Sequence, residues 1–383
     1  MARLPDTEGM PDEVIIQAAH RNDYDRAIRL AGARMVEVVT RGQLAAALSE
    51  RTALIAVIGD QAHLGEIPTP AMIEAGRARG IPVLVDAAAE RPDVPNVYLQ
   101  MGADAVTYSG GKCLRGPQAS GLVLGRRDLL WAAWLHGAPH HGVARPMKAG
   151  KEEIMGLLAA VEAWVLGRDH DAEWRAWEAC LECIAGALAD LPSLATAVEQ
   201  PGVANVTPTL RITWDPAALG ITPADAHRQI ETGNPPIALH LVADGLLVNP
   251  YMMEAGEEAI AATRLREVLG GGRLPLAAPE APAVDVAGEW LVEVSFVRGT
   301  ARYGITLVQE GGCLSGVCRS RYQQAPIQGE VVGRRVTLRT ALGYQSNRTP
   351  YRFTGALGED GCLQGELDCG EFGTARWRAT RVE

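Results

Sequence analysis

The sequence predicts an α/β domain with a mostly parallel sheet, a smaller α+β domain, and an all-β antiparallel barrel. Between residues 14 and 130, apolar strand-like runs alternate with helical runs, as in a parallel sheet with crossover helices. Three glycines at 270–272 and the prolines between 275 and 282 have the composition of a linker. Beyond the linker, short runs alternate apolar and polar residues, which is the pattern of antiparallel strands.

The first domain is expected to cover residues 1–150. Its helices are predicted at 23–31, 43–50 and 70–79, the last of which opens with a proline near its first turn. Its buried strands are predicted at 35–39, 53–58, 81–85, 103–107 and 121–124.

The second domain is expected to cover residues 151–270. Apolar residues recur at helical spacing in 151–166 and again in 172–191, and strands are predicted near 209–214 and 245–248. The linker is placed at 271–285, and the barrel at 286–383. The eight predicted barrel strands, which resemble the lipocalin-like group, are 290–297, 301–309, 313–319, 325–331, 335–340, 350–357, 362–367 and 374–381.

Charge and targeting signals narrow the choice of partner and location. With 36 basic and 46 acidic residues the net charge is -10, which disfavours nucleic acid and anionic lipid and leaves a small molecule as the expected partner. No apolar run approaches the ~18 residues that cross a bilayer, and no leader is visible. The seven cysteines are predicted to be reduced thiols of a cytoplasmic protein.

Lysine is rare in this chain. Only Lys112, Lys148 and Lys151 occur, so 33 of the 36 basic residues are arginine. A lysine that persists in such a chain suggests a need for an amine that can lose its proton, although chance is an equal explanation for any single lysine.

Two candidate site residues follow buried strands. Asp86 comes directly after the apolar run 83–85, and Lys112 ends the sequence Ser109-Gly110-Gly111-Lys112 after the next predicted strand. The carboxyl ends of parallel strands are where α/β sheets bind ligands. A phosphate-binding P-loop is excluded because Val106 and Cys113 stand where the motif needs glycine and serine or threonine, and no dinucleotide fingerprint follows a strand.

A strand-end carboxylate and a nearby lysine are the pair that pyridoxal phosphate requires. The lysine forms a Schiff base with the aldehyde, and the carboxylate keeps the pyridine nitrogen protonated so that the ring can accept electrons. Burial or neighbouring cations, with Arg115 close by, would have to lower the pKa of the lysine before it attacks a carbonyl.

At this point a family resemblance supports the same cofactor. The stretches IPVLVDAAAE, GADAVTYSGGKCLRGPQASGLVLGRRDLL and ARPMKAGKEEIMGLLAAVEAW, together with LPDTEGMPDEVIIQAAHRNDYDRAIRLAGARMVEV, resemble the fold-type-I pyridoxal-phosphate enzymes that include bacterial selenocysteine synthase and D-glucosaminate-6-phosphate ammonia-lyase. The resemblance covers about residues 4–270. It implies a class V aminotransferase-like three-layer sandwich with a small α+β domain.

The resemblance also implies roles for individual residues. Lys112 would be the Schiff-base lysine, Asp86 the pyridinium partner, Ser109 a contact of the cofactor phosphate, and His20 a ring-stacking imidazole. An anionic substrate would be bound by basic residues, namely Arg145, Lys148, Lys151 and Arg211. For these four, a solvated helix start or a salt-bridged strand arginine is the alternative interpretation, and His20 could instead be a capping or surface residue.

The sequence departs from the family at its start. Relatives carry roughly a hundred residues before the equivalent of Leu4, including a loop that holds the cofactor phosphate at a helix N-terminus. We therefore expect an incomplete fold with uncovered apolar sheet surface. A truncated gene product, a second polypeptide that supplies the part, and loss of cofactor binding all remain open.

The resemblance implies a lyase that eliminates a β-substituent or ammonia from an amino acid or amino-sugar acid, working as a homodimer or larger homo-oligomer. One alternative is a catalytically incomplete protein that acts as a binding module through its barrel. Another is a selenocysteine synthase-like transferase, which the acidic balance and the absence of a tRNA-binding appendage disfavour.

Overall fold

A computed structural model describes residues 2–202, 206–272 and 280–382. The chain divides into two compact units, residues 1–276 and 277–383, each of which is described by itself. Residues 273–279, the centre of the predicted linker at 271–285, lie outside the described residues. No helix of the described part is both long and apolar enough to cross a bilayer.

The first unit contains a six-stranded sheet in the order β2-β1-β3-β4-β5-β6. All neighbours pair in parallel except β5 and the edge strand β6, which are antiparallel. This confirms the mostly parallel α/β sheet. The strands are β1 (Glu13–Gln17), β2 (Arg34–Val38), β3 (Thr52–Ile58), β4 (Val83–Asp86), β5 (Ala105–Ser109) and β6 (Gly121–Gly125).

Capping residues mark the ends of several connecting helices. Thr40 and Gln43 form a capping box at the start of α2, and α3 ends at Gly80, whose left-handed backbone (φ +67°) suits glycine. The connections are η1 (Ala18–His20), η2 (Asp23–Asp25), α1 (Arg26–Arg29), α2 (Arg41–Ala47), η3 (Gly59–Leu64), α3 (Thr69–Arg79), α4 (Val97–Met101), α5 (Arg127–His136) and η4 (Arg145–Met147). The helix predicted at 23–31 is therefore a 3-10 turn and a single α turn.

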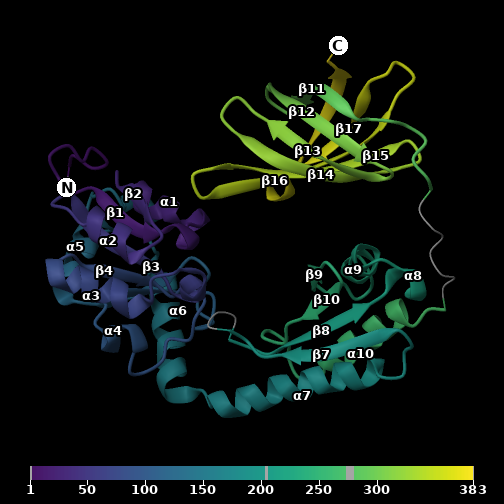
Figure 1. The fold of residues 1–383 in the computed structure, drawn as a ribbon. Helices are drawn as coiled ribbons and strands as arrows, with labels where there is room; N and C mark the ends of the chain where they lie inside the picture. Colours follow the sequence, from purple (N-terminus) through teal and green to yellow (C-terminus); the bar gives the residue numbers. More distant parts are fainter. Residues whose placement is uncertain (1, 203–205, 273–279, 383) are drawn as a thin grey trace. The chain divides into compact units, whose positions relative to one another are not determined.

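A four-stranded antiparallel sheet in the order β7-β8-β10-β9 forms the α+β part of the same unit. Helices α7 and α10 pack on one another and run along this sheet (Figure 1). Leu181, Ile184, Leu210, Ile212 and Leu265 are fully buried between them. The elements are α6 (Lys151–Glu162), a π turn η5 (Ala163–Gly167), α7 (His170–Leu188), β7 (Leu194–Glu199), β8 (Thr209–Trp214), α8 (Pro216–Leu219), α9 (Pro223–Glu231), β9 (His240–Val242), β10 (Gly245–Val248) and α10 (Glu257–Leu269).

The second unit is a closed barrel of eight consecutive antiparallel strands, which confirms the predicted barrel. Alternate residues of each strand point inward and form one packed core around Trp290, Phe353 and Trp377. The strands are β11 (Gly288–Ser295), β12 (Thr300–Glu310), β13 (Cys313–Arg319), β14 (Gln324–Val332), β15 (Arg335–Tyr344), β16 (Asn347–Leu357), β17 (Leu363–Asp368) and β18 (Thr374–Arg381).

Apolar surface is exposed around the edge strand β6 and its neighbouring helices. Neither α5 nor α6 buries a single residue, although both helices are rich in apolar side chains. By contrast, Ile16 and Ile58 in the middle of the sheet are buried. The expected exposure of apolar sheet surface is seen here only at the edge strand β6, at Val123. The other large apolar residues exposed in this region lie on α5 and α6 and are Trp131, Trp134, Ile154, Met155 and Leu158.

Candidate functional site

The carboxyl ends of the parallel strands bring the main candidates to one edge of the sheet. Asp86 is the last residue of β4, Ser109 is the last residue of the neighbouring β5, and Lys112 follows in the loop after β5. The amide of Ser109 donates a hydrogen bond to the Ala88 carbonyl, which joins the two strand ends. The topology thus makes neighbours of residues that are 26 positions apart.

Asp86 is a partly buried carboxylate with an available oxygen. Its Oδ1 accepts hydrogen bonds from the Ala88 amide (3.0 Å) and the Thr107 hydroxyl (3.4 Å). Oδ2 accepts none from the described residues. Burial raises the pKa of Asp86, while the two hydrogen bonds and the positive charge of Lys112 oppose that rise. The charge of Lys112 is thus a smaller influence on Asp86 than burial and the two hydrogen bonds.

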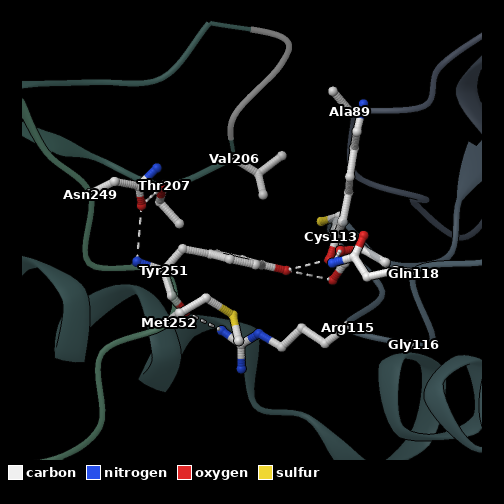
Figure 2. Close-up of a pocket in the computed structure, with 12 residues that line it drawn as sticks. Ala89, Cys113, Arg115, Gly116, Gln118, Val206, Thr207, Asn249, Tyr251 and Met252 are labelled. Carbon is white, nitrogen blue, oxygen red and sulfur yellow. Dashed lines mark hydrogen bonds between the residues drawn. The ribbon is translucent and has the colours of Figure 1, made fainter. Parts of the chain in front are cut away.

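The Lys112 loop forms one wall of a cavity of about 350 Å³ (Figure 2). Gly110 lets the loop close tightly, because a Cβ there would lie 1.9 Å from the Ser120 hydroxyl oxygen. The cavity is lined by Ala89, Gly111, Lys112, Cys113, Arg115, Gly116, Gln118, Val206, Thr207, Asn249, Tyr251 and Met252. The α+β part thus supplies the opposite wall.

Tyr251 bridges the two walls. Its hydroxyl lies 2.9 Å from the carbonyl oxygens of both Lys112 and Cys113, and its ring lies across the cavity (Figure 2). The guanidinium of Arg115 lies 4.6 Å from the centre of the Tyr251 ring and donates to the Tyr251 carbonyl. Sequence reasoning missed Tyr251, because no local motif marks a residue that is 139 positions from Lys112.

A second arginine, Arg168, also holds the loop that carries Lys112. Arg168 donates to the Cys113 carbonyl (3.1 Å) and forms a two-pronged ion pair with Glu173. Trp164 donates to the Pro92 carbonyl and packs with Cys113 and Leu114. The main-chain carbonyls of Lys112 and Cys113 therefore both accept hydrogen bonds from side chains outside the loop.

His20 follows β1 at the same edge of the sheet but is fully buried. Its Nδ1 accepts from the Ile58 amide (3.3 Å), and burial lowers its pKa, so the ring is neutral near pH 7. The aromatic ring that the structure places near Lys112 is Tyr24, whose centre lies 5.9 Å from Nζ. Tyr24 stands four residues after His20 and is exposed.

The four predicted anion contacts lie outside the cavity lining. Arg145 is half-buried and Lys148 is exposed at the ends of η4. Lys151 is 89% exposed at the start of α6. Arg211 on β8 forms ion pairs with Glu199 and Asp244. A salt-bridged strand arginine, the alternative interpretation of Arg211, describes what the structure shows.

A buried carboxyl, Glu90, lies beside Asp86. It is 5% exposed, Oε2 accepts from the Tyr98 hydroxyl (2.7 Å), and Oε1 has no hydrogen-bond partner among the described residues. Burial raises the pKa of Glu90 to about 7, and the negative charges of Asp60 and Asp86 add to the rise. Gly59 leaves room for it, since a Cβ there would lie 2.0 Å from Oε1.

Comparison with known proteins supports the resemblance. Residues 18–150 match the family Aminotransferase class-V. A D-glucosaminate-6-phosphate ammonia lyase from Salmonella typhimurium (strain 14028s / SGSC 2262) is 32% identical over an alignment of 284 residues that covers 70% of this chain and 73% of that protein. The chain belongs to the pyridoxal-phosphate-dependent family of this enzyme.

Other members of the family have different activities. A 5'-C-glycyluridine monooxygenase-decarboxylase from Streptomyces sp is 33% identical over 70% of this chain and 69% of its own length. An L-seryl-tRNA(Sec) selenium transferase from Proteus mirabilis (strain HI4320) is 28% identical over 40% of this chain and 38% of its own length. The solved structure of a D-glucosaminate-6-phosphate ammonia-lyase matches with a TM-score of 0.59 at 31% identity, covering 70% of this chain and 73% of that chain.

The residues at the site fit the cofactor of the family. Pyridoxal phosphate needs an amine for its aldehyde and an anionic acceptor for its ring nitrogen. Lys112 offers the amine from the cavity lining. Asp86, with Oδ2 available as the acceptor, lies at the same edge of the sheet but outside that lining, as do Ser109 and His20. The Ser109 hydroxyl makes no hydrogen bond with the described residues, and a phosphate oxygen would be a suitable acceptor for its proton. The described residues contain no group of three or more potential metal ligands.

Proposed function

We propose that this chain is a pyridoxal-phosphate-dependent lyase that releases ammonia from an anionic amino acid or amino-sugar acid, as its ammonia-lyase relative is named for. The observation that carries the proposal is geometric: Asp86 ends β4, and Lys112 lies in the loop after the neighbouring strand β5, at the same edge of the sheet. Membership of the family supports it.

The cofactor, when bound, would supply an electron-accepting ring. Lys112 would hold the cofactor through its aldehyde, and its Nζ would act as the base toward the carbon beside the substrate amine. Asp86 would keep a proton on the ring nitrogen through Oδ2. Ser109 is proposed to contact the phosphate, and His20 the ring.

Lys112 needs to be fixed in place for proton transfer, because a small displacement of a reacting group costs much rate. The hydrogen bonds that Tyr251 and Arg168 donate to the carbonyls of residues 112 and 113 fix the main chain on which this amine is carried. We propose that Arg145, Lys148 and Lys151 assist the approach of an anionic substrate. Arg211, engaged in two ion pairs, is the weakest candidate of the four for substrate contact.

Ammonia release tests the activity. The purified full-length protein, supplied with pyridoxal phosphate and D-glucosaminate 6-phosphate, should release ammonia and a keto acid, and Lys112→Ala should not. Release of carbon dioxide instead would favour chemistry like that of the decarboxylase relative. Absence of any product, with the cofactor bound, would contradict a lyase acting on this substrate.

The proposal extends to assembly and location. The exposed apolar residues on α5, α6 and β6 support a homo-oligomer in which this surface is buried, which light scattering and a Trp131→Asp variant would test. All seven cysteines are free thiols, which supports a cytoplasmic location. The packed interior of the barrel gives no support to a ligand held inside it, so the binding-module alternative is not favoured.

A further inference from the structure

The cavity beside Lys112 has an unusual charge. Its lining contains two cations, Lys112 and Arg115, and no carboxylate, although the whole chain carries a net charge of -10. A small cavity walled by cations on an acidic protein selects anionic ligands. The lining therefore indicates where the negative group of a substrate would bind.

The position of Arg115 is set by its backbone and by neighbouring rings. Its φ of +58° is in the left-handed region, which is uncommon for a residue with a side chain. Its guanidinium carbon lies 4.6 Å from the centre of the Tyr251 ring and 5.8 Å from that of Trp177. These rings keep the flat cation in the cavity wall while leaving its side chain 34% exposed.

Arg115 can accept a new anion without leaving a buried charge unpaired. Its contact with Glu173 is a single one at 3.3 Å. Arg168 meets the same carboxylate at 2.6 to 3.1 Å through two nitrogens. Glu173 thus keeps a strong cation partner when Arg115 turns to a ligand.

We propose that Arg115 is the specificity-determining residue that binds the carboxylate of the substrate. The inference rests on the proposed function, because it takes the cavity as the place where a substrate amine meets Lys112. In an amino acid the carboxylate is separated from the amine by one carbon, so it must bind to a cation that shares the cavity with Lys112. Arginine presents a planar pair of donors that matches a carboxylate.

Binding of amine-free probes tests the proposal independently of cofactor chemistry. Gluconate carries a carboxylate without an amine or phosphate, and glucose 6-phosphate carries a phosphate without a carboxylate. Isothermal titration of the full chain should show saturable gluconate binding that weakens about tenfold or more in Arg115→Met and less in Arg115→Lys. Arg228→Met, an exposed arginine paired with Asp225, is the matched control and should bind gluconate like the unmodified chain.

Several results would overturn the assignment. These are no saturable gluconate binding, equal binding in Arg115→Met, or loss of glucose 6-phosphate binding while gluconate binding persists. If Arg115→Met does not fold by circular dichroism, Arg115→Gln replaces it. A change of tryptophan fluorescence on adding gluconate that is absent in Trp177→Phe gives a second readout. Mixing Arg115→Met with pyridoxal phosphate separates the two proposals, because the variant should still form the imine if only the carboxylate site is lost. Imine failure in the unmodified chain would instead count against the proposed function.

Discussion

The hydroxyl of Tyr251 lies 2.9 Å from the main-chain carbonyl oxygen of Lys112 and equally close to that of Cys113. One phenolic proton is shared between two carbonyls of the loop that carries the amine. Tyr251 belongs to the turn after β10, so a residue of the α+β part holds a loop of the α/β part. Arg115 packs on the face of the same ring.

Tyr251→Phe should weaken the positioning of Lys112 while keeping the ring contact with Arg115. Loss of a shared hydrogen bond should cost about 1 kcal/mol of stability. If the proposed function holds, kcat should fall several-fold with little change in KM, because positioning of the amine matters after substrate binds. Urea unfolding and steady-state kinetics measure the two effects. An unchanged kcat would show that the hydrogen bond does not position the amine.

Glu90 should make stability depend on pH. Its pKa is about 7 in the folded chain against 4.5 when unfolded, so the folded state retains the proton in this interval. Burial of Glu90 costs no stability below pH 4.5, where the carboxyl is protonated in both states. The free energy of unfolding then falls as the pH rises towards 7, and above pH 7 it is lower by on the order of 3 kcal/mol.

Glu90→Gln cannot ionise and should remove this dependence. The difference in unfolding free energy between the variant and the unmodified chain, measured from pH 4.5 to 8, should change in favour of the variant as pH rises. Tyr98, Asp60, Asp86 and Asp93 face Glu90 and are retained in both proteins, so their effects largely cancel. A difference that does not vary with pH would contradict a carboxyl of raised pKa at this position.

Cys113 should resist alkylation despite its place beside Lys112. Burial raises the pKa of its thiol to about 11, and its side chain is 5% exposed. Its thiolate fraction near pH 7 is then roughly a hundredfold lower than that of an ordinary thiol. Mass spectrometry after iodoacetamide treatment should show Cys183 and Cys313, which are exposed, labelled first. Early labelling of Cys113 would indicate that the loop opens in solution.

The barrel should depend on its central aromatic pair. Phe353 is 1% exposed and meets Trp377 edge to face at 5.4 Å. Phe353→Ala should lower the unfolding free energy of the barrel by about 3–5 kcal/mol. The fluorescence of the barrel tryptophans during guanidinium unfolding reports this change, with Phe372→Ala on the surface as the control. Equal effects of the two variants would argue against the packed interior.

The sequence predicted the barrel most closely, because apolar and polar residues alternate along every strand that has one face buried and the other exposed. The run predicted at 313–319 is identical to β13. By contrast, the strand Glu13–Gln17 was missing from the prediction, although it pairs with both β2 and β3. It is short and its apolar run of three cannot be distinguished by period from a helical segment. The helix at 151–166 was predicted at its start, but its last turn is a π turn with wider spacing.

For the candidate site, the sequence indicated the residues that follow strands of the parallel sheet. It missed the residues of the α+β part that contact the loop carrying Lys112. Asp86 and Lys112 are marked by local pattern, an apolar strand before each. Tyr251 and Glu173 contact the lysine loop only because the α+β part folds against it. Their spacing along the chain carries no such information, and the cavity that gives Arg115 its proposed role exists only in three dimensions.

Borohydride trapping of the cofactor tests the central claim most directly. The full-length protein is mixed with pyridoxal phosphate, reduced and digested, and the modified peptide is located by mass spectrometry. We predict a single reduced pyridoxyl group on Lys112, with an imine absorbance band whose position shifts in Asp86→Asn. Modification spread over Lys148 and Lys151, or none at all, would contradict the account.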